Sequence, residues 1–122
     1  MKAYTDLEQS KKLAEILPLE SADMFLALDG TLPVMSKYID DGFVTADNTA
    51  IPCWSLAALL KVLPHSLDDR YTLQLGYPPG DGDWYIMYVD TSGFIKSPAV
   101  AHSNLIDACV EMIVKLKEKD LL

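Results

Sequence analysis

The chain has 122 residues, half of them apolar, and its 10 Lys and Arg against 18 Asp and Glu give a formal net charge of −8. A chain of this length can bury a packed core without a metal ion or disulfide bonds. Its acidic surface repels phosphate groups, so the composition argues against nucleic acid and anionic membrane surfaces as partners.

The sequence favours a cytoplasmic protein in a reducing compartment. The N-terminal residues MKAYTDLEQSKK turn polar where a signal peptide would become apolar. No apolar run approaches the roughly 18 residues that a membrane-spanning helix needs. The two cysteines, Cys53 and Cys109, fall in segments predicted as the start and the interior of helices. We therefore expect both to be small buried core residues that keep free thiols.

The N-terminal part of the chain predicts a helix and then a hairpin. Thr5 and Glu8 have the spacing of a capping box, which predicts a helix over residues 6–17. Two short apolar runs within residues 22–35 then flank Asp29-Gly30, the dipeptide that best suits a tight two-residue turn. These runs indicate two antiparallel strands.

Residues 51–64, IPCWSLAALLKVLP, predict a buried helix with a defined start. Ser55 is a good N-cap, which places the first helical residue at Leu56. Trp54 and Leu59 flank that cap with the spacing of a hydrophobic staple. Because the segment is apolar nearly all round, we expect the helix to be covered on every side.

The C-terminal part predicts an antiparallel meander followed by a helix. Residues 71–77, 84–90 and 94–96 are rich in aromatic and β-branched side chains and are separated by turn sequences. Asn104 is placed to cap a final helix that runs to about Lys119. The fold class is therefore α+β: an antiparallel meander of about three to five strands, packed with about three helices into a layered sandwich. A single domain over residues 1–122 is expected.

No complete catalytic or metal-binding set occurs in the sequence, and no cofactor is expected. Residues 27–32, ALDGTL, resemble the DxDGTL signature of haloacid dehalogenase-type phosphatases, but Ala27 stands where that chemistry needs a nucleophilic aspartate. Neither CxxC nor HxxxH spacing is present. The remaining catalytic candidates are Cys53 as a nucleophile, next to a helix start that would lower its pKa, and His102 as its base.

The hairpin aromatics suggest a surface for another protein. Strand alternation puts Trp84 and Tyr88 on one face of the sheet and Tyr85 and Met87 on the other, and both faces are largely apolar. One expectation is a sheet covered by helices on each side. The alternative is that one face stays partly open for a partner or for self-association, with candidate residues Trp84, Tyr85, Met87 and Tyr88.

Four runs carry a resemblance to a known family: EQSKKL at residues 8–13, Ala22-Asp23-Met24, residues 51–64, and DACVEM at residues 107–112. With these runs the chain resembles a family of small uncharacterised proteins from gut Bacteroidales and their phage-like elements. That family is similar in layout to the phage-associated α/β/α sandwich domain. The resemblance implies an antiparallel sheet covered by helices and an association with mobile elements, and it implies no functional residue.

Three functions follow as hypotheses. The first is a small non-enzymatic accessory protein that binds an unidentified protein or a second copy of itself. The second is an enzyme that uses Cys53 with His102. The third is an acidic mimic of nucleic acid, which would need its carboxylates along one face.

Overall fold

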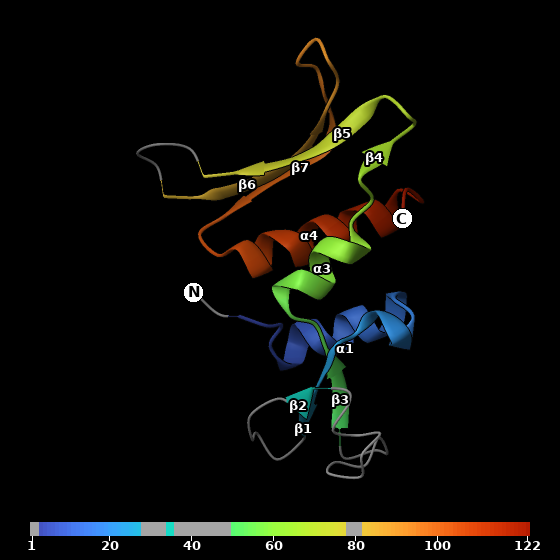
Figure 1. The fold of residues 1–122 in the computed structure, drawn as a ribbon, viewed down its shortest axis with the longest axis vertical. Helices are drawn as coiled ribbons and strands as arrows, with labels where there is room; N and C mark the ends of the chain where they lie inside the picture. Colours follow the sequence, from blue (N-terminus) through green and yellow to red (C-terminus); the bar gives the residue numbers. More distant parts are fainter. Residues whose placement is uncertain (1–2, 28–33, 36–49, 78–81) are drawn as a thin grey trace. The chain divides into compact units, whose positions relative to one another are not determined.

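The computed structural model describes residues 3–27, 34–35, 50–77 and 82–122, which form two compact units, residues 3–59 and residues 60–122 (Figure 1). Each unit combines helix with antiparallel sheet, so the predicted α+β class is confirmed. The single domain over residues 1–122 stays a prediction. The unit boundary falls inside helix α3, and each unit is described below by itself.

The first unit contains a three-stranded antiparallel sheet in the order β2-β1-β3. Its elements are α1 (Leu7–Ile16), the 3-10 helix η1 (Leu19–Ser21), β1 (Met24–Ala27), β2 (Val34–Met35) and β3 (Ala50–Cys53). Strands β1 and β2 pair as the predicted hairpin, with Met24 opposite Met35. The predicted turn at Asp29-Gly30 lies outside the described residues.

The capping box of α1 lies one residue later than the sequence suggested. Asp6 is the N-cap: its carboxylate accepts the Gln9 amide at 2.8 Å, and the Gln9 side chain accepts the Asp6 amide at 3.1 Å. The prediction of Thr5 and Glu8 for these roles was wrong. Thr5 is instead fully buried, and its hydroxyl accepts a hydrogen bond from the Trp54 amide.

Strand β3 leads directly into α3 (Leu56–Val62), whose predicted start is confirmed. The Ser55 hydroxyl accepts the Ala58 amide at 3.3 Å, the N-cap contact expected from the sequence. The strand itself was missed, because residues 50–53 include a proline and show no alternation. Pro52 is tolerated since β3 is an edge strand, where a missing amide donor costs no hydrogen bond in the ladder.

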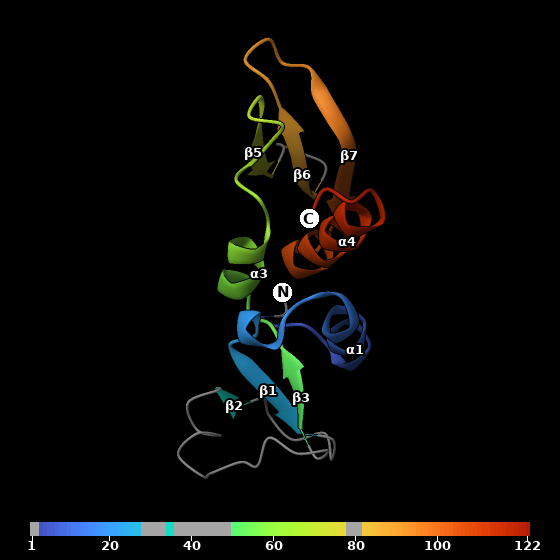
Figure 2. The same cartoon turned by 90° about the vertical axis from the view of Figure 1, so that its right-hand side faces the viewer.

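The second unit is a four-stranded antiparallel sheet in the order β4-β5-β6-β7, with helix α4 packed against β6 and β7 (Figures 1 and 2). The strands are β4 (Ser66–Leu67), β5 (Tyr71–Gly76), β6 (Trp84–Val89) and β7 (Ile95–His102), and α4 is Leu105–Glu118. The predicted meander is confirmed. The last strand continues well past the predicted residues 94–96, because an edge strand accommodates Pro98 beside an irregularity in its pairing with β6.

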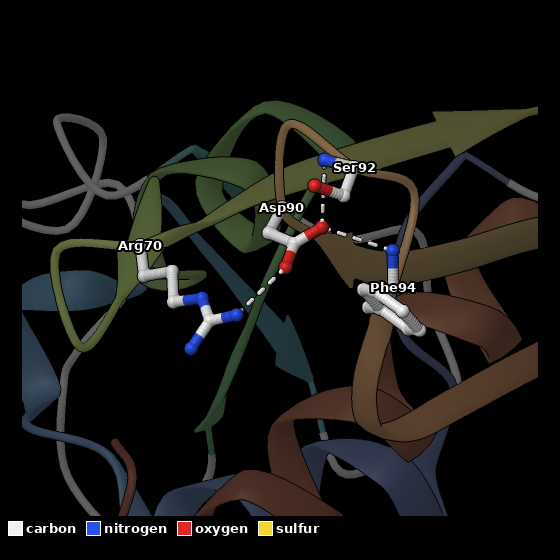
Figure 3. A network of polar contacts seen from close by, with 4 residues as sticks. All are labelled: Arg70, Asp90, Ser92 and Phe94. Atoms are coloured by element: carbon white, nitrogen blue, oxygen red, sulfur yellow. Dashed lines mark hydrogen bonds and ion pairs between the residues drawn. The ribbon is translucent and has the colours of Figure 1, made fainter.

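A three-residue turn fixes the β6–β7 hairpin. Gly93 has a φ of 87°, which suits the left-handed position that ends such a turn. The Asp90 carboxylate accepts the Ser92 and Phe94 amides, both at 2.9 Å, and Arg70 at 3.2 Å (Figure 3). Desolvation acts to raise the pKa of Asp90, but the amides of Phe94 and Ser92 together with Arg70 hold that pKa below its ordinary value. The charged carboxylate thus holds the turn.

Helix α4 supplies much of the core of the second unit. The Asn104 side chain accepts the Ile106 amide at 2.8 Å and the Asp107 amide at 3.3 Å, so the predicted N-cap is confirmed. Its buried side chains cover a broad face: Leu105, Ile106, Ala108, Cys109, Val110, Met112, Ile113 and Leu116. The polar side chains of Asp107, Glu111 and Lys115 lie along one stripe of the helix and are half-buried.

Candidate functional site

The two faces of the four-stranded sheet have different surroundings. On the inner face, Ile86 and Tyr88 of β6 are fully buried on the side that α4 covers. The strand register places the opposite set of side chains together on what we call the outer face. Its described members are Ser66, Thr72, Gln74, Gly76, Tyr85, Met87, Val89, Ile95, Ala99 and Ala101.

The outer face carries no charged side chain at these described positions, although the chain as a whole has a net charge of −8. Its β5 positions Thr72 and Gln74 are exposed, and Ile95 is 54% exposed. A solvent-facing side of an antiparallel sheet is normally polar, and usually bears charges. Within the described part of the second unit, no helix packs on this face. The outer face therefore combines apolar side chains with uncharged polar ones, and no helix of the second unit's described residues covers it.

Tyr85 shapes one end of the outer face. A Cβ built on Gly76 would come within 2.6 Å of the Tyr85 hydroxyl and 2.7 Å of its ring, so the tyrosine lies across the glycine on the neighbouring strand. On the other side, Tyr85 is opposite the small residue Ala101 of β7. The face therefore has larger side chains along β6 and small ones at Ala99 and Ala101 of β7, whose first residue, Ile95, is large.

The structure separates the four residues predicted to form an interaction surface. Tyr85 and Met87 lie half-buried on the outer face. Trp84 and Tyr88 share the inner face, where Tyr88 is fully buried and donates a hydrogen bond to the Pro64 carbonyl at 2.8 Å. The face assignment made from strand alternation is confirmed. Of the four residues, Tyr85 and Met87 are the ones on the open side.

Cys53 lies at the end of β3 in the first unit and is fully buried. Burial, together with the nearby Asp23 carboxylate, raises the pKa of its thiol to about 12. A protonated, buried thiol is a poor nucleophile at neutral pH. The start of α3 was expected to lower this pKa, but burial and Asp23 raise it instead.

The surroundings of Cys53 form a hydrogen-bonded anchor within the first unit. Thr5 donates its amide to the Trp54 carbonyl at 2.9 Å and accepts the Trp54 amide on its hydroxyl at 3.1 Å. The Trp54 indole donates to the Ser21 hydroxyl at 3.0 Å. Asp23 accepts both the amide and the hydroxyl of Ser55. The polar groups flanking Cys53 are thus engaged in holding the chain together.

His102, the other half of the predicted pair, lies at the end of β7 in the second unit. Its Nε2 atom is 3.0 Å from a Glu111 carboxylate oxygen on α4, and Lys115 is 3.8 Å from the other oxygen. This contact ties β7 to α4. Cys53 belongs to the first unit and His102 to the second. Their pairing as nucleophile and base stays a prediction.

Three buried weak acids, Cys53, Cys109 and Tyr88, predict a loss of stability at alkaline pH. Burial raises each pKa to about 12, from 9.0 for the thiols and 10.0 for the phenol. Because the pKa is higher in the folded state, the stabilisation is complete below about pH 9 and is lost as the pH rises toward 12. Denaturant titrations across this range should show it, with a shallower loss in Cys109→Ala. An equal slope in that variant would contradict this assignment.

Several carboxylates lie beside cations, which limits the acidic-mimic hypothesis. Asp68 is 3.2 Å from Lys96, Asp90 is 3.2 Å from Arg70, and Glu111 is 3.8 Å from Lys115. Over the described ranges, no three His, Cys, Asp or Glu side chains gather closely enough to hold a metal ion. No helix within those same ranges is both long and apolar enough to cross a bilayer.

Sequence reasoning missed the partners that hold the first unit together. Thr5 and Asp23 meet residues 54 and 55 across separations of 49 and 32 residues. No local pattern carries such a pairing. The outer face was detectable in principle, because its uncharged positions follow the alternation of the strands, but its extent depends on the register of all four strands.

No protein-family model, curated protein or solved structure matches this chain.

Proposed function

We propose that the protein is a non-enzymatic accessory protein that binds a protein partner through the outer face. The observation that carries the proposal is the lack of charge at the described positions of that face in a strongly acidic chain. A partner that presents an uncharged, apolar surface fits this chemistry. Burying such a face stabilises a complex by roughly 25 cal/mol for each Å² of apolar area removed from water.

The position of Tyr85 and Met87 supports the proposal. Both side chains are only half-buried, although each is large and apolar. Aromatic residues and methionine are enriched in protein interfaces, where they supply contact area at a low cost in conformational entropy. The turn held by Asp90 and the cross-strand contact of Tyr85 with Gly76 keep the face in one shape. A preformed surface loses less entropy on binding.

The cysteine-centred activity has less support, because Cys53 is buried and its pKa is raised. The association with mobile elements and the kinship with the Bacteroidales family rest on the sequence runs alone and are kept as proposals. A cytoplasmic location is proposed on the same footing, from the character of the sequence.

Capture from a native lysate tests the proposal when variants are compared. We expect a partner, either another protein or untagged copies of the chain, to be retained by the wild type and lost with Met87→Glu. Thr72→Glu adds a charge at an exposed outer-face position. If Met87→Glu fails to fold, Thr72→Glu still tests the outer face. Leu19→Glu is the matched control, since Leu19 is 59% exposed in η1, outside this face.

Circular dichroism should show that all variants keep the wild-type fold. A partner that is retained equally by wild type, Met87→Glu and Thr72→Glu would overturn the proposal. Loss of the partner with Leu19→Glu as well would also contradict it, because the effect would then not belong to the outer face.

A further inference from the structure

The edge strands of the two described sheets are protected against pairing with another chain. An unpaired strand edge presents backbone donors and acceptors, and proteins commonly block such an edge with proline, with charge or by keeping the strand short. Strands β3 and β7 contain Pro52 and Pro98, while β2 and β4 have two residues each. Because β4 is so short, however, it leaves part of the longer strand β5 unpaired on that side.

The open part of β5 begins after Leu73. The His65 carbonyl accepts the Leu73 amide at 3.0 Å, just beyond the pairing of β4 with the start of β5. The chain before His65 turns away, since the Pro64 carbonyl accepts the Tyr88 hydroxyl on the inner face of the sheet. In an antiparallel ladder the amides and carbonyls of alternate residues point to the same side, so those of Leu75 point past the end of β4. No turn or loop backbone group among the described residues bonds to them.

Residues 74–77, which we call the β5 edge, have none of the protective features. They include no proline and no charged residue. Leu75 is 36% exposed and Tyr77 is 52% exposed, although both are large and apolar. Leu75 is opposite the inner-face residue Ile86, and the Tyr77 ring packs edge-on against Trp84 with the ring centroids 5.1 Å apart. The β5 edge therefore joins unpaired backbone groups to exposed apolar side chains on one side.

We infer that the β5 edge binds an extended segment of another protein, which adds to the sheet as a strand antiparallel to β5. An extended backbone is the partner that matches outward amides and carbonyls, and alternate side chains then give specificity. The direction follows β4, which is antiparallel to β5 on the same edge. This site is separate from the outer face and does not depend on the proposed function.

The chemistry of the segment follows from the side chains and the charge of the protein. Apolar side chains at alternate positions lie beside Leu75 and Tyr77, where they remove exposed apolar area from water. Basic side chains occupy the positions between, because a chain with a net charge of −8 attracts a cationic segment. The same charge repels a second copy of the chain, which disfavours pairing of two β5 edges.

An NMR titration of the isotope-labelled full chain tests the site. The probe is a short synthetic peptide of alternating valine and lysine, blocked at both ends. In the antiparallel pairing its valines lie beside Leu75 and Tyr77 with their amides toward β5, whereas its lysine amides face away. Two derivatives with the same charge and side chains separate strand pairing from charge attraction, one N-methylated at the valines and the other at the lysines.

The unmodified and lysine-methylated peptides should shift the amide signals of Leu75 and Tyr77, with a dissociation constant of about 100 μM, as suits a short segment. The valine-methylated peptide should bind about tenfold more weakly or not at all, because it loses its backbone hydrogen bonds to β5. Unchanged signals from α4 show that the second unit stays folded during the titration.

Three variants test the β5 edge from the side of the protein. Leu75→Pro removes the outward amide at a position where an edge strand tolerates proline, and should weaken binding about tenfold or more. Leu75→Thr keeps strand propensity but loses apolar contact, and should weaken binding about threefold, which still tests the site if the proline variant fails to fold. Leu19→Thr is the matched control and should bind like the wild type, since Leu19 lies in η1.

Equal binding of the two N-methylated peptides would overturn the inference, since charge alone would then hold the peptide. Wild-type binding by a folded Leu75→Pro would overturn it too, as would unshifted Leu75 and Tyr77 signals at about 1 mM peptide. If these signals shift when the chain alone is concentrated, a second copy occupies the edge and the stated partner is wrong. Lysate capture through the outer face, tested with Met87→Glu, is unaffected by any of these results.

Discussion

Replacing Trp54 by alanine is expected to reduce the free energy of unfolding by about 3–5 kcal/mol. The indole is fully buried, so the substitution removes a large apolar group and leaves a cavity. It also removes the donor that the Ser21 hydroxyl accepts. Because small proteins are stable by only about 5–15 kcal/mol, such a loss takes a large part of the total. Urea denaturation followed by circular dichroism measures it.

Trp54→Phe separates packing from hydrogen bonding at the same position. The phenyl ring keeps most of the buried apolar volume but lacks the indole donor, so we expect a smaller loss of about 1–2 kcal/mol. Leu19→Ala serves as the control, because Leu19 is largely exposed and should change stability by less than about 0.5 kcal/mol. Equal stability of wild type and Trp54→Ala would show that the residue does not hold the first unit together.

Tyr88→Ala is expected to cost about 3–5 kcal/mol in the second unit, the range for removing a buried aromatic side chain. Tyr88 is fully buried on the inner face, opposite Leu73 of β5. Its hydroxyl donates to the Pro64 carbonyl at 2.8 Å, which fixes the chain between α3 and β4. The loss should appear as a lower midpoint of thermal unfolding.

Tyr88→Phe keeps the ring and deletes the hydroxyl. The Pro64 carbonyl then loses its donor, for an expected cost of about 1–2 kcal/mol. The same variant should flatten the stability profile above about pH 10, because burial raises the pKa of Tyr88 to about 12 and phenylalanine cannot ionise. A Tyr88→Phe variant with wild-type stability at both neutral and alkaline pH would show that the phenol contributes neither effect.

Local signals predicted the elements that depend on neighbouring residues. Ser55 and Asn104 were found as N-caps because each accepts amides within three residues. The β5–β6 hairpin was found because its strands are rich in aromatic residues and are joined by turn sequence. In such places the sequence near an element determines where it begins.

Elements that depend on distant partners were missed. Strand β3 forms because β1 offers it an edge, with Cys53 opposite Met24, and the segment itself has no strand pattern. Thr5 resembled a helix cap, but the Trp54 backbone competes for its hydroxyl, and Asp6 caps α1 in its place. The length of β7 was underestimated because proline normally interrupts a strand, whereas an edge position tolerates it.

The sequence predicted part of the candidate site. Alternation along β6 correctly divided Tyr85 and Met87 from Trp84 and Tyr88. It did not show which face α4 would cover, because that depends on tertiary packing. Nor did it show that Ala99 and Ala101 join the same face, since β7 was predicted to end before them.

Photo-crosslinking from the outer face tests the central claim most directly. A benzoylphenylalanine placed at Gln74, exposed on β5, reacts with whatever protein covers that face, while the same group at Lys117, exposed on α4, is the control. The account predicts a protein adduct from Gln74, either with another protein in native lysate or with a second copy of the chain in concentrated purified protein, and much less from Lys117. No protein adduct from Gln74, in purified protein or in native lysate, would contradict the claim that this face binds a protein.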